Sequence, residues 1–375
     1  MKIVKSAVQI LHAPADEQLV DVQPQAGGMR AFVTLKIMTD EGIEGIGVTF
    51  APGLGLSPLA SALGSIVEAL CGLAEGEDPM EIESVMQGLR QKTSGSGPGG
   101  LLTLAMSAVD MALWDIKGKA TGQSIHKMLG GAQDRVRTYI AGGYYAQGKG
   151  IEELQEEVQF NVEEMHASAV KIKIGDPNMG IAGDMRRIEA SRKAIGDKAT
   201  LLVDANCSLD LETSLEFSRQ LPQYDVYWFE EPLPIHNYEG HRQLSEASSV
   251  KIATGENGYH FAHFKTLLDH KGASILNVDV AIVPGYDIAM DISDLASERG
   301  VSIAPHGCQE LQLPLVASIP HGEFLEIYPV AVDPLRSEMF QPLLKPDTDG
   351  YVTVPDRPGI GYELNMDLLN RYRVG

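Results

Sequence analysis

The chain has 375 residues, of which 44% are hydrophobic and 22% are charged, so it can bury a large core and is predicted to form two domains. Its formal net charge of −21 excludes nucleic acid as an expected partner, because phosphate binding needs a basic surface. Three widely separated cysteines argue against a disulfide framework or a structural zinc site, and they predict a reducing, cytoplasmic location. No run has the apolar length of a signal peptide or a transmembrane helix, so no membrane partner is expected.

Residues 1 to 125 read as an α+β unit in which strands and helices are segregated. Alternating apolar residues predict strands, and a spacing of three to four predicts helices. The strands are expected within 1–10 and 30–50, and the helices within 57–74 and 101–122.

From about residue 135 the pattern changes to a strand-like run followed by a helical stretch, repeated at intervals of roughly 20 to 35 residues, as in βα repeats. The runs are "VRTYIAGG", "AVKIKIG", "VDAN", "VYWFEEP", "KIATGEN", "SILNVDV", "VSIAPHG" and "EFLEIYP". Eight such strands predict an α/β barrel. We place a capping domain at 1–125, the barrel at 126–350 and a C-terminal segment that returns to the capping domain at 351–375.

Seven of these runs carry an ionisable residue at or near the carboxyl end, where barrels of this kind build their active sites. Three of these residues are the acids Asp204, Glu230 and Glu256, which are spaced 26 and 26 residues apart and so come from successive strands. Three converging carboxylates would repel one another unless they shared a divalent cation. Their hard oxygen ligands favour Mg²⁺.

The remaining ionisable residues predict acid/base chemistry on two sides of that metal. Lys171 and Lys173 alternate along one strand and so point to one face, where repulsion from each other and from the nearby metal is expected to lower their pKa values toward that of a base. His306 is expected to pair with Asp279, which would orient the imidazole and raise its pKa. Glu326, on the last strand, completes the ring.

This ordered set resembles the mandelate racemase subgroup of the enolase superfamily. The similarity lies in "KIK", "VDAN", "FEEP", "GEN", "NVDV" and "APHG", and it extends to "AMSAVDMALWDIKGKATG" and "RPGIGYEL", so it covers nearly the whole chain. The resemblance implies a modified (β/α)7β barrel of TIM type under an N-terminal α+β cap. It assigns Mg²⁺ to Asp204, Glu230 and Glu256, base function to Lys173 with Lys171 assisting, acid/base function to His306 with Asp279, and substrate contacts to Glu326 and Asn206.

The reaction implied is abstraction of the proton α to a carboxylate, through an enediolate that the metal stabilises. Dehydration of an acid sugar to a 2-keto-3-deoxy acid ranks first, a sugar-acid cycloisomerase second, and a racemase or epimerase of a 2-hydroxy acid third. The polar segment 12–30 corresponds to the specificity loop of the family and favours a polyhydroxylated acid. Within it, Arg30 is a candidate for binding a distal carboxylate. By analogy, a homo-oligomer is expected.

Two other functions are less consistent with this set of residues. A non-catalytic binding scaffold would show a gap in the set, and a Schiff-base aldolase using Lys173 would not need three acids. Glu231 alternates to the opposite face from Glu230 and is expected to support the site or to form an ion pair in the barrel wall. His260 and His263 are expected at the surface. Cys207 and Cys308 are expected to be packing or lining residues.

Overall fold

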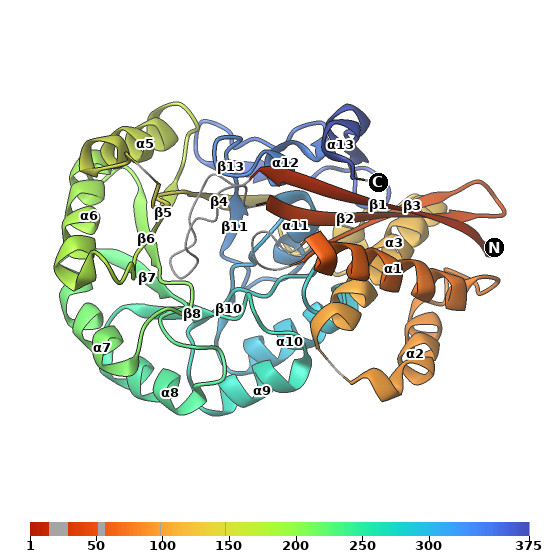
Figure 1. Ribbon diagram of the computed structural model, residues 1–375, viewed down its shortest axis with the longest axis horizontal. Coiled ribbons are helices and arrows are strands. Elements are labelled where there is room, and N and C mark those ends of the chain that lie inside the picture. Colours follow the sequence, from red (N-terminus) through yellow and green to blue (C-terminus); the bar gives the residue numbers. More distant parts are fainter. Residues whose placement is uncertain (15–28, 52–56, 98, 147, 375) are drawn as a thin grey trace.

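The computed structural model describes residues 1–14, 29–51, 57–97, 99–146 and 148–374. The polar segment 12–30, interpreted above as a specificity loop, lies largely outside the described residues. The described part consists of an antiparallel sheet with its helices, at the right of Figure 1, and a barrel ringed by helices, at the left.

The N-terminal sheet has the order β1-β2-β3 and carries helices against it. Its strands are β1 (Ile3–Pro14), β2 (Met29–Thr39) and β3 (Glu44–Ala51), and its helices are α1 (Ser57–Ala74), α2 (Ile82–Lys92), the short 3-10 turn η1 (Ser94–Ser96), α3 (Gly100–Thr121) and α4 (Ile125–Met128). Gly45 and Gly47 let β3 approach α3 closely, because a Cβ at either position would overlap the carbonyl oxygen of Ala112 or Ala108.

The barrel consists of parallel strands in the order β10-β9-β8-β7-β6-β5-β4-β11. The strands are β4 (Arg135–Ala141), β5 (Ala169–Lys173), β6 (Thr200–Asp204), β7 (Val226–Glu230), β8 (Lys251–Thr254), β9 (Ile275–Leu276), β10 (Ser302–Ile303) and β11 (Phe324–Ile327). The helices between them are α5 (Ile151–Glu163), α6 (Gly180–Ile195), α7 (Leu211–Gln220) with η2 (Leu221–Tyr224), α8 (Tyr238–Ala247), α9 (Phe261–Asp269), α10 (Tyr286–Glu298) and α11 (Gln309–Ser318).

Backbone hydrogen bonds close the ring between β10 and β11, the two ends of this strand order. The amide of Ile303 donates to the carbonyl of His321 at 3.0 Å, and the amide of Glu323 donates to the carbonyl of Ile303 at 2.9 Å. Strand, helix and closure together confirm the expected (β/α)7β barrel with an N-terminal α+β cap.

A layer of apolar side chains fills the barrel interior. Each of the eight barrel strands, or the residue directly after it, contributes one side chain. Its members are Tyr139, Ala169, Leu202, Trp228, Ala253, Ile275, Ala304 and Phe324. Because side chains alternate along a strand, the residue two positions later also faces inward, one level nearer the carboxyl end. That level holds Lys171, Asp204, Glu230, His306 and Glu326, so the packed layer forms the floor of the ionisable site.

The C-terminal part of the chain contacts both domains. Its elements are α12 (Pro334–Glu338), β12 (Phe340–Gln341), β13 (Tyr351–Thr353), β14 (Glu363–Leu364) and α13 (Met366–Tyr372). Strand β13 pairs antiparallel with β4, so the C-terminal segment that begins at residue 351 also contacts the barrel sheet. Beyond it, the amide of Val374 donates to the carbonyl of Ile10, which returns the chain to the capping sheet.

None of the helices in the described part of the chain combines the length and the apolar character needed to cross a membrane.

Candidate active site

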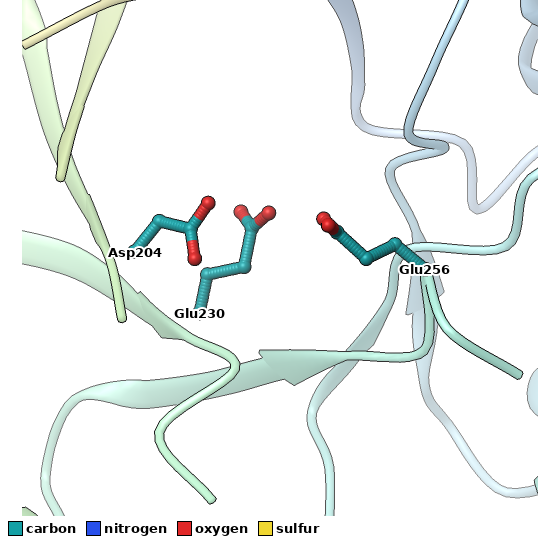
Figure 2. Close-up of side chains that lie close together, drawn as sticks. All are labelled: Asp204, Glu230 and Glu256. Atoms are coloured by element: carbon teal, nitrogen blue, oxygen red, sulfur yellow. The ribbon is translucent and has the colours of Figure 1, made fainter. Parts of the chain in front are cut away.

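Three carboxylates meet at the mouth of the barrel. Asp204 ends β6, Glu230 ends β7, and Glu256 follows β8 by two residues. Parallel register places Asp204 beside Glu230 and Glu230 beside Ala253. One oxygen from each of the three carboxylates lies within 4.8 Å of those of the other two, and Figure 2 shows the three groups pointing toward one another.

This donor set fits a hard divalent cation. All three residues are buried, and Glu230 Oε2 and Glu256 Oε2 have no hydrogen-bond partner among the described residues. Burial raises the pKa of Glu230 well above its usual range, despite attraction from Lys171, and repulsion from Asp204 and Glu256 adds to the rise. A cation between the three groups would remove this penalty, and Mg²⁺ is the hard cation that such oxygens prefer.

Two lysines stand beside the triad on β5, but they occupy different depths. Lys171 Nζ contacts Glu230 Oε1 at 2.6 Å and Glu326 Oε1 at 2.9 Å. Lys171 is not among the residues that line the cavity. Lys173 lines the cavity and pairs with Asp204. Lys173 is therefore placed to meet a substrate, while Lys171 holds the two glutamates.

Contacts with carboxylates raise the pKa values of both lysines in this arrangement. Burial alone would lower the pKa of Lys173, but attraction by Asp204 outweighs it and the pKa is raised. The same balance, with Glu230 and Glu326 as the partners, raises the pKa of Lys171 well above its usual value. Each ammonium contacts a carboxylate directly, and this attraction exceeds the repulsion between the two ammonium groups.

His306 lies on the other side of the triad and forms the expected pair with Asp279. Its Nδ1 is 2.8 Å from Asp279 Oδ2, and its Nε2 is 3.9 Å from Glu256 Oε1. Burial acts to lower the pKa of His306, but the carboxylates of Glu256, Asp279 and Glu326 raise it overall. Gln312 on α11 donates to Asp279 Oδ1 at 2.6 Å and so fixes the aspartate that orients the imidazole.

Glu326 lies below the cavity rather than in its wall. Its Oε2 accepts a hydrogen bond from the amide of Gly307 at 3.1 Å. Burial would raise its pKa, but Lys171 and His306 lower it to about 2. An ionised carboxylate only accepts hydrogen bonds, so the hydrogen bond to a substrate carboxylate that the resemblance implies would require Glu326 to carry a proton.

A cavity of about 450 Å³ opens between the barrel mouth and the cap. Of the residues named from the sequence, Lys173, Asn206, Glu256, His306 and Arg30 line it. Asn206 is placed by a backbone turn with φ of 42°, in which its amide donates to Asp204 Oδ1 at 2.8 Å. The cavity thus brings together Glu256 of the carboxylate triad, the side chains of Lys173 and His306, and groups from both domains.

Arg30 reaches the cavity from β2, as its assignment to substrate binding requires. Its Nη1 contacts Asp333 Oδ2 at 2.8 Å and donates to the carbonyl of Val332 at 2.9 Å, and both of these residues lie after β11. This contact joins the cap to the barrel at the cavity wall.

Glu231 is buried directly after β7, where a φ of 41° interrupts the alternation of the strand, and the side-chain amide of Asn257 donates to its two oxygens at 3.0 Å and 2.9 Å. The Cys207 thiol also hydrogen-bonds to Glu231, so its partners among the described residues are neutral groups and not the cation of an ion pair. Asn257 itself lines the cavity, so Glu231 orients a cavity residue.

The expectation of a surface position is wrong for His263, which is buried under α8. Its Nδ1 is 2.9 Å from the hydroxyl of Tyr238, and burial, followed by neighbouring histidines, lowers its pKa to about 4. His260 instead caps α9, accepting a hydrogen bond from the His263 amide at 3.2 Å. Sequence spacing alone gave no sign of the aromatic pocket that surrounds His263.

The cysteines occupy packing or lining positions. Cys207 lines the cavity and Cys308 is buried beneath it. Burial raises the pKa of both thiols, and the nearest carboxylates, Glu231 and Glu310 respectively, raise it further. Neither thiol is activated as a nucleophile.

Sequence reasoning missed several cavity residues. They are Phe32, Phe50, Tyr144, Asn257, Tyr259, Ile282, Tyr328 and Arg336. Most come from the cap or from loops after strands, where no periodic pattern indicates which way a side chain points. The one available signal was "DPLRSE", in which an N-capping Asp333 and a proline predict a helix start that carries Arg336.

A capped (β/α)7β barrel with a carboxylate triad between two bases defines an enolase-type enzyme. The N-terminal domain of the mandelate racemase / muconate lactonizing enzyme family matches residues 8–130, and the enolase C-terminal domain-like family matches residues 153–368. The chain therefore belongs to the mandelate racemase / muconate lactonizing enzyme family, which confirms the resemblance seen in its motifs.

Characterised relatives share about a third of their residues with this chain. It is 32% identical to L-talarate/galactarate dehydratase of Salmonella typhimurium over 335 residues, which cover 89% of this chain and 81% of the relative. It is 31% identical to arabinonate dehydratase of Saccharolobus solfataricus, with 91% and 90% covered. It is 30% identical to 3,6-anhydro-alpha-L-galactonate cycloisomerase of Streptomyces coelicolor, with 93% and 94% covered.

Solved structures agree over the whole chain. The S. typhimurium L-talarate/galactarate dehydratase, liganded with Mg and L-lyxarohydroxamate, superposes with a TM-score of 0.90 at 28% identity, covering 100% of this chain and 93% of that one. A racemase from Streptomyces coelicolor with bound magnesium superposes with a TM-score of 0.89 at 27% identity. The match covers 99% of this chain and 100% of that one.

Proposed function

We propose that this protein is a magnesium-dependent enzyme that removes the proton α to the carboxylate of an acid sugar and expels the β-hydroxyl as water. The observation that carries this proposal is the placement of Lys173 and His306 on opposite sides of one carboxylate triad, with Lys173, His306 and the triad's Glu256 lining one cavity. The relatives named as dehydratases support the reaction class, and the magnesium in related structures supports the cofactor.

Asp204, Glu230 and Glu256 would hold the magnesium ion. When bound, it supplies a positive charge that stabilises the enediolate as the α-proton leaves. Lys173 would then lose part of its attraction to Asp204, since that carboxylate is shared with the metal, and its pKa would fall toward that of a base. Lys171 would keep Glu230 in place.

Lys173 and His306 would divide the proton transfers between them. Lys173 takes the α-proton from one face, and the electron pair of the C–H bond forms the enediolate. Protonated His306 then donates its proton to the β-hydroxyl, the C–O bond breaks, and water leaves to give a 2-keto-3-deoxy acid after tautomerisation. His306 can also return a proton to the α-carbon, which would give the epimer.

A cycloisomerase of an anhydro or lactone sugar acid is the second candidate, because a relative 30% identical carries that activity in its name. The same two bases would serve this reaction. The C–O bond that breaks would then belong to the ring of the substrate, in place of the bond to the β-hydroxyl. A scaffold role and a Schiff-base aldolase have less support, because every ligand and base position is filled and Lys173 pairs with Asp204.

We also propose a cytoplasmic location and a homo-oligomeric assembly. The three cysteines are free in the structure, which agrees with a reducing compartment. Sedimentation of the purified protein tests the assembly, and a monomer at all concentrations would contradict it.

Proton NMR in D₂O with Mg²⁺ tests the reaction, using a panel of mono- and diacid sugars with mandelate as a control. Loss of the α-proton signal together with a 2-keto-3-deoxy product is the expected result. Exchange or epimer formation alone would indicate a racemase, and a cyclic isomer would indicate a cycloisomerase. If no acid in the panel exchanged its α-proton while magnesium was bound, the proposal would be wrong.

A further inference from the structure

Arg336 on α12 lines the cavity, and the proton-transfer scheme gives it no role. The residue is only 9% exposed. Its Nη1 contacts Asp333 Oδ2 at 3.1 Å, whereas its Nε has no hydrogen-bond partner among the described residues. A buried donor without a partner is costly, so its place at a cavity wall suits an acceptor supplied by a ligand.

A single carboxylate faces two guanidinium groups at this wall. Asp333 Oδ2 lies 2.8 Å from Arg30 Nη1 as well as 3.1 Å from Arg336 Nη1. Its other oxygen accepts from the backbone amides of Leu335 and Arg336, both at 3.1 Å, at the start of α12.

Aromatic rings enclose the guanidinium of Arg336. Its Cζ lies 4.7 Å from the ring centroid of Tyr328, 5.1 Å from that of Phe50 and 5.5 Å from that of Phe32. Burial acts to lower the pKa of Arg336, but Tyr328 and Asp333 raise it overall, so the group stays charged. The rings hold it in a low-dielectric wall, where its attraction for an anion is stronger than in water.

The ring of Tyr328 lies next to both Arg336 and His306, so it gives an upper limit for the distance between them. The ring centroid of His306 is 6.5 Å from that of Tyr328, which itself lies 4.7 Å from Arg336 Cζ. Arg336 Cζ is therefore no more than about 11 Å from the imidazole centroid.

A parallel arrangement exists on the lysine side. Lys173 Nζ and Arg30 Cζ lie 5.0 Å and 6.0 Å from the ring centroid of Tyr144, so their separation is also at most about 11 Å. Each arginine thus shares a neighbouring aromatic ring with one of the two bases, and these upper limits keep it within reach of the far end of a sugar acid whose α-carbon lies between the bases.

We infer that Arg336, with Arg30 beside it, binds a second carboxylate at the far end of the substrate, so that the enzyme prefers sugar diacids to sugar monoacids. The inference rests on the proposed function, because it takes the first carboxylate to lie at the triad. A guanidinium presents a planar fork that matches a carboxylate in two hydrogen bonds, which a terminal hydroxyl cannot provide. Arg336 is then a specificity-determining residue.

Matched substrate pairs test the inference. Galactarate and galactonate differ only in the oxidation state of the terminal carbon, and kcat/KM is measured for each with Mg²⁺. The wild-type enzyme is expected to favour the diacid, and Arg336→Met is expected to reduce that preference by about 30-fold or more, mainly through KM. Arg336→Lys keeps the charge without the fork and is expected to fall between the two.

Two further variants separate recognition from folding. Arg187 is also a buried arginine stacked on a tyrosine, 4.2 Å from the ring centroid of Tyr145, but it lies outside the cavity wall, so Arg187→Met is expected to change both substrates by the same factor. Asp333→Asn removes the competing carboxylate and is expected to strengthen the diacid preference, in the opposite direction from Arg336→Met.

The outcomes distinguish the two proposals. Wild-type enzyme that turned over the monoacid as well as the diacid, or Arg336→Met that lowered both equally, would overturn the diacid inference and leave the proposed function standing. If Arg336→Met did not fold, an unchanged preference in Arg336→Lys and Asp333→Asn would overturn it. If wild-type enzyme acted on no sugar acid at all, the proposed function would fail and the inference with it.

Discussion

Lys173 pairs with Asp204, a carboxylate that the proposed magnesium site also uses. This sharing would let a stably buried lysine act as a base. The carboxylate stabilises the ammonium, and magnesium at the triad would weaken that attraction. Lys171 differs because it also contacts Glu326, which is not one of the proposed metal ligands.

Replacing either base should stop turnover without unfolding the protein. Lys173→Ala and His306→Asn are each expected to lower kcat for a substrate that uses both faces by about 100-fold to 10,000-fold, the usual contribution of a positioned acid or base. Steady-state rates with the substrate identified by NMR measure this loss. In each variant the other base is intact, so α-proton exchange on its own face should persist. Full activity in both variants would contradict the assignment of two bases.

The residues of the site differed in how far the sequence revealed them. The acids, the lysines and His306 were predictable because alternation along a strand tells which side chains face inward. The pKa direction of Lys173 was not, since it depends on which oxygen the ammonium touches. Arg336 was not predicted either, because its role depends on a contact with Asp333 and on rings from the cap, which lie about 300 residues away in the chain.

At the scale of elements, the barrel strands repeat one rule: an apolar floor residue is followed, two positions later, by a residue of the site. Leu202 and Asp204 on β6, and Trp228 and Glu230 on β7, show it most clearly. Strand positions were therefore predictable from hydrophobic runs. The strand lengths were not, since β9 has only two residues and Asp279 lies in the turn after it.

Helices α8 and α9 enclose a neutral histidine that makes stability depend on pH. Burial lowers the pKa of His263 from 6.5 to about 4, so the unfolded chain binds a proton more readily than the folded one between these values. Its contribution is complete above about pH 6.5 and is lost as the pH falls toward 4, by up to about 3 kcal/mol. Urea unfolding at pH 7.5 and pH 5 is expected to show lower stability at the acid pH.

His263→Gln separates this contribution from that of other titrating groups. The variant removes the proton-binding ring, while a side-chain amide remains to meet the hydroxyl of Tyr238. The difference in unfolding free energy between the two pH values should therefore be smaller in the variant than in the wild type. An equal difference would show that His263 does not titrate in this range. His166→Gln, on the loop before β5, is the control and should leave the difference unchanged.

Across the whole molecule, the cap and the barrel are joined by buried polar contacts as well as by apolar packing. Thr49 and Ser107 of the cap both donate to the carbonyl of Ala281, at 3.0 Å and 2.9 Å. Asp110 on α3 accepts from the amide of Tyr286 at 2.7 Å. The order of the domains was visible in the sequence, but these contacts were not, because each joins residues about 170 to 230 positions apart.

Because of these contacts, magnesium at the barrel mouth should stabilise the cap as well. Binding to the folded state alone adds about 2.7 kcal/mol at a concentration 100 times Kd, which is expected to raise the melting temperature by a few degrees in one cooperative transition. Calorimetry with and without EDTA measures the shift. Glu256→Gln should lose most of it and, without metal, should be at least as stable as the wild type, because one of three repelling carboxylates is gone. Glu323→Gln, which removes an acid paired with Lys251 outside the triad, should keep the shift. Two separate transitions, of which magnesium moved only one, would show that the cap and the barrel are thermodynamically independent.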